Sequence, residues 1–232
     1  MSVAAKSAEE QAAYTKSLMD AEKLAASMFD DIEQLIKPGI TDKELSDAIH
    51  KLGQEKHGVR SDWHKRIVRS GPNTLAPFEA NTPDRTIEAD DILIVDLGPV
   101  FEQWEADFGR TYVLGNDAAK LHLRDALEPT WKRIKAAYDE NPSMTGHELH
   151  SICVQEAERQ GFVWGAFLGG HTLGQFPHER IPRDKVTLYI TEGNHNSMQS
   201  IDKKGFSRHW ILEVHLRDTA NNIQGFYEQL LC

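Results

Sequence analysis

The chain has 232 residues, of which 40% are hydrophobic, and its formal net charge is −10. This length can bury the core of one large domain or two small ones, and the acidic balance argues against a nucleic-acid backbone as the main partner. No apolar run approaches the roughly 20 residues that a membrane-spanning helix needs, so we expect no membrane partner either.

Cysteine usage and the first residues indicate the compartment. Cys153 and Cys232 are too few for a disulfide framework and suit a reducing environment. The N-terminal stretch is charged and lacks the apolar segment of a signal peptide. We therefore expect a soluble, cytoplasmic protein.

Two amphipathic helices are predicted near the N-terminus. Residues 8–36 contain no Gly or Pro, and apolar residues recur there at spacings of three and four until Pro38-Gly39 ends the helix. Thr41, with Glu44 three residues later, forms the capping box of a second helix. We expect both helices to pack against the core.

Two more helices are predicted in the second half of the chain. One spans residues 118–138, with Pro129 as a point of interruption. The other follows Thr145, where Glu148 completes another capping box. Cys153 lies on the apolar face of that helix, so we interpret it as a core residue and not as a nucleophile.

The connection from residue 63 to residue 84 combines a short predicted strand with irregular, turn-rich stretches. Ile67-Val68 suits a short strand, and residues 70–73 and 81–84 are rich in turn formers. Because long irregular connections inside a domain are often functional, we expect this segment to contribute to a site.

The strongest pattern lies in the middle of the chain. Apolar, β-branched runs at residues 92–95 and 111–114 are typical of strands. A hairpin centred near residues 101–102 would place Asp96 opposite Asp107, with their Cβ atoms roughly 5 Å apart. A cation or a shared proton would relieve the repulsion between these carboxylates. The alternative, two solvated acids, is less favoured because Asp96 continues an apolar run.

A second strand pair near the C-terminus repeats this arrangement. The apolar runs at residues 210–214 and 226–231 each contain one acid. A hairpin centred near residues 220–221 sets Glu213 opposite Glu228. The alternative is an exposed edge hairpin with solvated glutamates.

Histidines lie in the loop at residues 169–182. Glycines before His171 allow close backbone approach, and His178 follows in the same Gly- and Pro-containing segment. A lone histidine is usually structural, but imidazole is also a common metal ligand and proton carrier, so two in one loop favour a function.

These acids and one imidazole form a set of candidate metal ligands: Asp96, Asp107, His171, Glu213 and Glu228. Hard oxygen donors with one nitrogen suit two divalent ions of Mn, Fe(II) or Co, with Zn as a further option, and the lack of thiolates argues against structural zinc. A pair of ions about 3.5–4 Å apart activates a bridging water and polarises a carbonyl, which is hydrolytic chemistry.

The motifs resemble the pita-bread metallopeptidase family of methionine aminopeptidase, aminopeptidase P, prolidase and creatinase. The shared features, in the family's order, are VDLG and ADFGRT around the first acid pair, the GHxxG and HERIP motifs, and the two late glutamates. PGITDKEL (38–45) and SGPN (70–73) resemble the prolidase branch. The similarity covers about residues 18–231. It implies an α+β pita-bread fold, a curved antiparallel β-sheet covered by helices. The whole chain, 1–232, would be one catalytic domain, with residues 1–17 as a mobile helical extension.

The resemblance also implies roles for the candidate ligands. Asp96 would chelate one ion and His171 the other, while Asp107 and Glu228 would bridge both. Glu213 would be a ligand and the general base or proton shuttle.

Two further roles follow from the resemblance. His178 would contact the scissile carbonyl and stabilise the oxyanion, and Thr111 would lie close to the metals.

The chain departs from the family near the expected substrate. Relatives usually carry a histidine in the turn after SGPN, but here Phe78-Glu79 follow Pro77, and His64 lies before the turn. Glu79 could substitute as the acid, or the step could be absent. We expect Phe78, Glu79 and His178 to bind substrate, beside a long insertion at residues 191–209.

Three functions are consistent with the sequence. The first is a dinuclear metal-dependent aminopeptidase or dipeptidase that cleaves an N-terminal residue or a Xaa-Pro bond in a small peptide, as a monomer or homodimer. The second is a creatinase-like metalloenzyme acting on a small non-peptide C–N substrate. The third is a non-catalytic binding protein of the same fold, which the retained ligands argue against.

Overall fold

The computed structural model describes residues 3–179 and 186–232. Its helices are α1 (Ala8–Ile32), α2 (Asp42–Lys56), α3 (Ala118–Glu140) and α4 (Gly146–Arg159), with 3-10 turns at Glu33–Leu35, Gly71–Leu75 and Val186–Leu188. Its strands are β1 (Val59–Asp62), β2 (Ile67–Ser70), β3 (Ile92–Leu97), β4 (Pro99–Phe101), β5 (Trp104–Glu105), β6 (Phe108–Val113), β7 (Val163–Trp164), β8 (Thr172–Leu173), β9 (His209–Asp218) and β10 (Ile223–Leu230).

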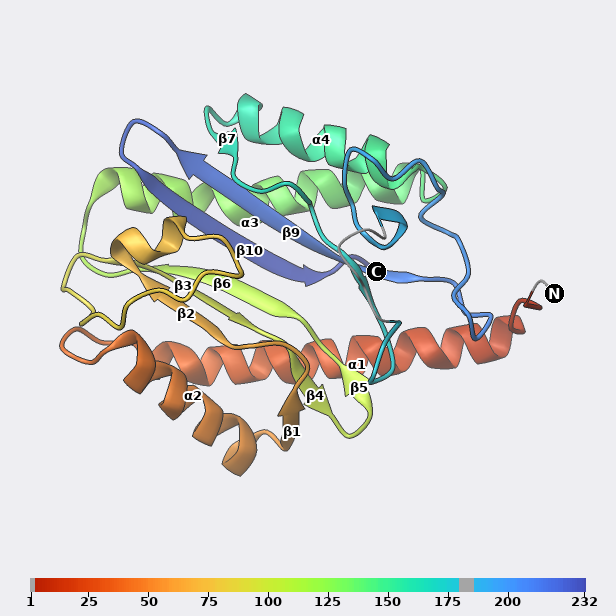
Figure 1. Cartoon of the computed structure of the whole chain (residues 1–232), viewed down its shortest axis with the longest axis horizontal. Coiled ribbons are helices and arrows are strands. Elements are labelled where there is room, and N and C mark those ends of the chain that lie inside the picture. Colours follow the sequence, from red (N-terminus) through yellow and green to blue (C-terminus); the bar gives the residue numbers. More distant parts are fainter. Residues whose placement is uncertain (1–2, 180–185) are drawn as a thin grey trace.

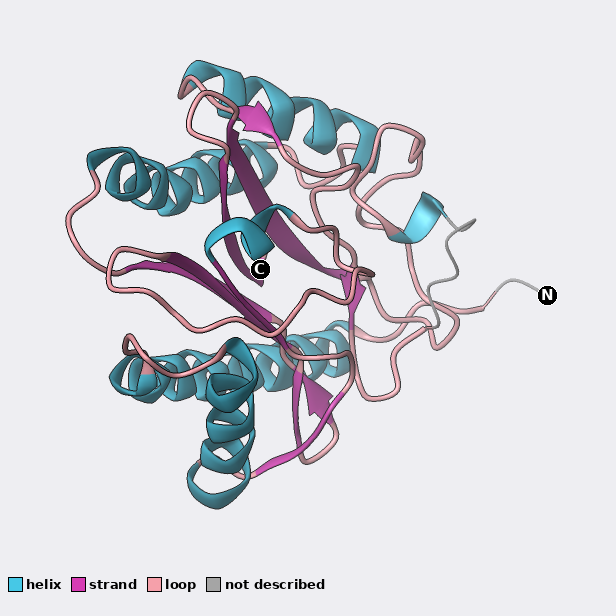
Figure 2. Ribbon diagram, turned by 60° about the vertical axis from the view of Figure 1, so that its left-hand side comes forward, coloured by secondary structure: helices cyan, strands magenta, loops and turns pink. Residues whose placement is uncertain are grey.

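The strands form one large antiparallel sheet and one small sheet. The large sheet has the order β2-β3-β6-β10-β9-β7, with β8 paired to β9, and the small sheet has the order β1-β4-β5. Figures 1 and 2 show α1 and α2 against one half of the large sheet and α3 and α4 against the other half.

Side-chain alternation in the strands sends apolar and acidic residues to opposite faces. Leu93 and Val95 of β3 belong to the buried cluster built by α1 and α2, so Asp96 between Val95 and Leu97 points away from those helices. Leu212 and Val214 of β9 pack with α3 and α4. The carboxylates of both halves therefore lie on the sheet face that the helices leave open.

The predicted helices form, with small differences at their ends. Capping boxes at Thr41 and Thr145 begin α2 and α4 as expected. The first helix ends at Ile32, four residues before the predicted end, and a 3-10 turn follows. Helix α3 continues through Pro129 without interruption. In the N-terminal extension, Tyr14 of α1 is buried and its hydroxyl accepts a hydrogen bond from the Gln175 N–H at 2.9 Å.

The register of the first hairpin differs from the prediction by two residues. Asp96 faces Gly109 and not Asp107, because the turn falls between Glu102 and Gln103, one residue later than expected. Glu102 adopts a left-handed conformation there, with φ 54°. A shift of two residues keeps each side chain on its face of the sheet, so Asp107 lies on the same face as Asp96.

The second hairpin has the predicted register, with Glu213 opposite Glu228. Glu228 in turn faces Gly109 of β6. One row across the sheet therefore contains Asp96, Gly109, Glu228 and Glu213, which brings three carboxylates from three strands onto neighbouring positions.

Gly170 allows the loop that carries His171 to pack closely against β9. Its φ is +137°, and a Cβ added there would lie 1.9 Å from the carbonyl oxygen of Ile211. We expect Gly170→Ala to lower the free energy of unfolding by about 2–4 kcal/mol, because backbone strain and overpacking both oppose it. Urea unfolding measures the change.

The matched control is Gly193→Ala, where the nearest atom is a Val186 methyl at 3.6 Å. That variant should stay within about 1 kcal/mol of wild type. Equal stability of the two variants would contradict the packing described for Gly170.

Candidate metal centre

The structure brings the five predicted ligands to one place. Asp96 and Glu228 come from β3 and β10, Glu213 comes from β9, Asp107 directly precedes β6, and His171 directly precedes β8. The four acids are buried, and Asp107 is only 1% exposed. Each is therefore held away from bulk water by strands whose other face packs on helices.

Asp107 lies at the centre of this group. His171 Nε2 is 3.2 Å from Asp107 Oδ2 and 3.7 Å from Glu213 Oε1. Single ligand atoms of Asp107, His171 and Glu228 all lie within 4.8 Å of one another. The carbonyl oxygen of Thr172 lies 3.0 Å from His171 Nδ1 and accepts its hydrogen bond, which turns Nε2 toward the acids.

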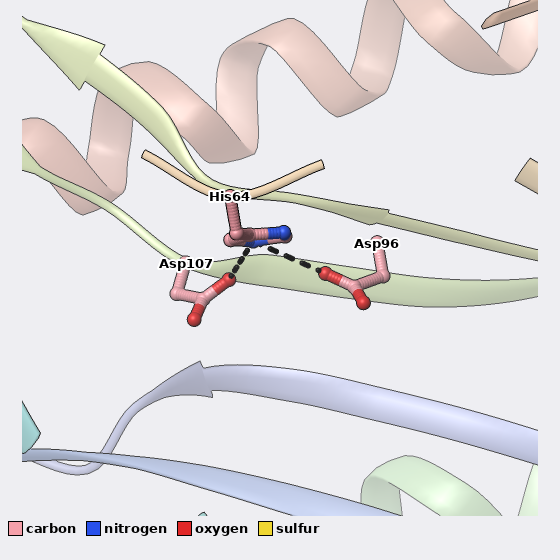
Figure 3. A group of neighbouring side chains, drawn as sticks. All are labelled: His64, Asp96 and Asp107. Carbon is pink, nitrogen blue, oxygen red and sulfur yellow. Dashed lines mark hydrogen bonds and ion pairs between the residues drawn. The ribbon is translucent and has the colours of Figure 1, made fainter. Parts of the chain in front are cut away.

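His64, which was not among the predicted ligands, also enters the centre. Its Nε2 is 3.1 Å from Asp107 Oδ1 and 3.6 Å from Asp96 Oδ1. Figure 3 shows the interactions of the ring with both carboxylates. Ligand atoms of these three residues likewise lie within 4.8 Å of one another. The pairing of Ile67 with Asp96 in β2 and β3 carries the preceding loop over the site. A prediction of this strand pairing would have placed His64 near Asp96.

Burial and neighbouring charges shift the pKa values of these groups in opposite directions. Desolvation, reinforced by Asp107 and Glu213, raises the pKa of Asp96 although His64 opposes the rise. Desolvation and the nearby acids raise the pKa of Glu228 well above its usual range. Desolvation also acts on Asp107, but the charges and hydrogen bonds of His64 and His171 outweigh it and lower its pKa.

The donor set fits divalent cations. A buried carboxylate oxygen normally has a hydrogen-bond partner, yet Glu228 Oε2 has none among the described residues. Four buried acids close together are costly unless positive charge compensates them. Oxygen donors with imidazole nitrogen are the ligands that Mn, Fe(II), Co and Zn accept.

Glu105 and His178 form a hydrogen-bonded pair beside the metal centre. Glu105 of β5 is fully buried, and its carboxylate accepts hydrogen bonds from His178 Nδ1 at 2.7 Å and from the His178 backbone N–H at 3.0 Å. Glu105 was not predicted as a site residue, because Val100 is its strand partner and no spacing links it to His178.

Trp63 connects the three histidines. Its ring centroid lies 4.4 Å from that of His64, 5.3 Å from that of His171 and 4.9 Å from that of His178, in each case edge to face. Its indole N–H donates to the carbonyl oxygen of Ala106 at 3.0 Å. One indole therefore fixes the spacing between the candidate ligands and His178.

The remaining predicted residues lie around the centre. Phe78 is 48% exposed, and its ring centroid is 5.8 Å from that of His64. Glu79 is exposed beside it. Thr111 bonds both backbone groups of Phe226, which joins β6 to β10 next to Glu228.

The insertion also forms part of a cavity. Residues 202–204 and 207–209 of the 191–209 insertion, Tyr14 and the loop carrying His178 line a cavity of about 210 Å³. In the HERIP motif, residues 180–182 lie outside the described residues.

Comparison with known proteins identifies the family. Residues 16–200 match metallopeptidase family M24, so the chain belongs to this family and the predicted resemblance is confirmed. It is 27% identical over 149 residues to a Xaa-Pro dipeptidase of Pyrococcus horikoshii, covering 62% of this chain and 40% of that protein. It is 26% identical over 175 residues to methionine aminopeptidase A of Synechocystis, covering 69% and 68%. The match spans less than half the length of the dipeptidase.

Solved structures show the fold. The X-Pro aminopeptidase of Thermotoga maritima matches with a TM-score of 0.76 at 18% identity, covering 94% of this chain and 60% of that chain. The methionine aminopeptidase of the same organism matches with a TM-score of 0.70 at 16% identity, covering 99% and 94%. The predicted α+β pita-bread fold is confirmed. Among the described residues, no helix is long and apolar enough to cross a membrane.

The stability of the metal-free protein should depend on pH. The acids around His64 and His171 outweigh desolvation and raise the pKa values of both histidines, that of His171 to about 9. A raised pKa stabilises the fold below the unfolded value of about 6.5, and this contribution is lost as the pH rises through the folded value. The raised pKa of Asp96 acts with the same sign from about pH 4 upward.

We therefore expect the Tm of chelator-treated protein to fall between pH 6.5 and 9, by about 2–4 °C for each kcal/mol lost. Added Mn²⁺ should reduce this loss because it replaces the protons. Thermal unfolding with and without Mn²⁺ measures both effects. A Tm that rises over this range without metal would contradict the charge assignment.

Proposed function

We propose that this chain is a dinuclear metal-dependent peptidase that releases an N-terminal residue or cleaves a Xaa-Pro bond in a small peptide. The observation that carries the proposal is the convergence of four buried carboxylates and His171 around Asp107, in a chain of metallopeptidase family M24. We further propose that residues 1–232 act as one catalytic domain.

In this proposal Asp96 would hold one ion, while His171 and Glu213 would hold the other. Asp107 and Glu228 would be shared between the two ions, and Asp107 already presents one oxygen to His64 and the other to His171. Mn, Fe(II) or Co suits these donors, with Zn as an alternative, and such ions when bound polarise a carbonyl and lower the pKa of water.

Glu213 is the proposed proton acceptor. Its Oε2 lies 3.0 Å from His215 Nε2, and its Oε1 faces His171 at 3.7 Å. The contact with His215 orients the carboxylate, so it can take a proton without rotating away from the reacting atoms.

His178 stabilises developing negative charge on the scissile carbonyl. Because Glu105 accepts the hydrogen bond from Nδ1, Nε2 is the ring nitrogen left to face a substrate. From this position Nε2 would interact with the oxygen of the scissile carbonyl as negative charge develops on it. The backbone bond at His178 N fixes the ring's position.

Asp107→Ala should abolish metal binding and hydrolysis together, with activity falling by more than about 100-fold. The assay is release of free amino acid from a panel of dipeptides and Xaa-Pro peptides with Mn²⁺ or Co²⁺, combined with elemental analysis. The matched control is Asp125→Ala on α3, whose side chain is 64% exposed. Full activity in a metal-free Asp107→Ala protein would refute the proposal. Turnover of only non-peptide C–N substrates would favour the creatinase-like alternative.

His178→Ala should lower kcat by about 10²–10³-fold and leave metal content unchanged, because the residue acts on substrate. Glu105→Gln should lower kcat by a smaller factor with KM little changed, since it removes the carboxylate that orients the ring. Steady-state kinetics and elemental analysis on the same preparations test both. Loss of metal in either variant would show that the residue has been misassigned.

A further inference from the structure

His64 and His171 approach Asp107 in the same way from opposite sides. His171 Nε2 lies 3.2 Å from Asp107 Oδ2, and His64 Nε2 lies 3.1 Å from Asp107 Oδ1. Each also faces a second acid, Glu213 Oε1 at 3.7 Å for His171 and Asp96 Oδ1 at 3.6 Å for His64. The two halves of the centre therefore have matching donors.

The other ring nitrogens match as well. His64 Nδ1 lies 2.7 Å from the carbonyl oxygen of Lys65, and His171 Nδ1 lies 3.0 Å from that of Thr172. In both cases the next residue's carbonyl oxygen accepts the Nδ1 hydrogen bond, which turns Nε2 toward the acids. Histidines that bind metals are usually oriented by such a bond.

The spacing around His64 suits a shared cation. Ligands at about 2.0–2.1 Å from one ion lie about 3.0–3.4 Å from each other. The distances from His64 Nε2 to Asp107 and Asp96, 3.1 and 3.6 Å, are close to this range. Figure 3 shows the imidazole between the two carboxylates.

The fold provides space for this ring. A Cβ at Gly98 would lie 2.2 Å from His64 Cδ2, so glycine at that position admits the imidazole. The backbone N–H of Trp63 donates to the carbonyl oxygen of Gly98 at 2.9 Å, and its indole packs against the His64 ring. The side chain of His64 is only 10% exposed. Burial, the Trp63 contact and the space at Gly98 together hold the imidazole against the acids.

We propose that His64 is a sixth metal ligand, so that each ion of the centre is held by one imidazole. This inference rests on the proposed dinuclear function. A nitrogen donor beside Asp96 makes that ion's site more favourable for Co²⁺ or Zn²⁺, relative to Mn²⁺, than an all-oxygen site would be. As a ligand, His64 does not replace the histidine that is absent at Phe78.

The test is a titration of metal-free protein with Co²⁺. Calorimetry, visible absorption and proton NMR detect the binding. Wild type and the control His122→Ala, which alters an exposed histidine, should bind two ions. Each should show two hyperfine-shifted exchangeable Nδ1–H signals. His64→Ala should lose one of these signals and bind one ion about 100-fold more weakly, with the other affinity unchanged. If the alanine variant does not fold, His64→Gln, which keeps a polar side chain, replaces it in the same titration.

The outcomes separate the two proposals. Two ions in wild type, with unchanged affinities and both signals in the His64 variants, would overturn only the role of His64. Tighter binding in the variants would also overturn it, because the imidazole would then compete with the ion for Asp96 and Asp107. Wild type that binds no second ion would refute the dinuclear function together with this inference.

Discussion

Burial of four carboxylates around Asp107 is the constraint on which the rest of the structure depends. Removing one ionised carboxylate from water costs free energy, and repulsion among several adds to that cost. The two imidazoles that flank Asp107 neutralise part of the charge, and Glu228 Oε2 still has no hydrogen-bond partner among the described residues. Such a cluster is compensated fully only by protons or cations.

The fold creates this cluster by ordinary sheet geometry. Apolar residues on one face of β3 and β9 bury against α1, α2, α3 and α4, so the alternate residues Asp96 and Glu213 must point to the open face. Gly109 occupies the row between Asp96 and Glu228, where a side chain would meet the Phe226 ring at 2.2 Å. Packing of the helices and placement of the acids are therefore two consequences of one strand pattern.

Local patterns could predict the elements and the acids but not every contact. Capping boxes and apolar spacing predict the helices, and the register of the C-terminal hairpin is predictable because polar, turn-forming residues after Asp218 mark its turn. The first hairpin differs from its predicted register by two residues because its turn, Glu102-Gln103, contains none of the Gly, Pro, Asn or Asp residues that usually mark a turn. His64 and Glu105 were missed because their partners depend on pairings between remote segments, which periodicity alone does not specify.

The most direct measurement of the central claim is a crystal structure of Mn²⁺-loaded protein with anomalous diffraction. We expect two peaks about 3.5–4 Å apart, one on each oxygen of Asp107, with His171 and Glu213 beside one peak and Asp96 beside the other. No peak between these carboxylates, or peaks confined to exposed acids elsewhere, would contradict it.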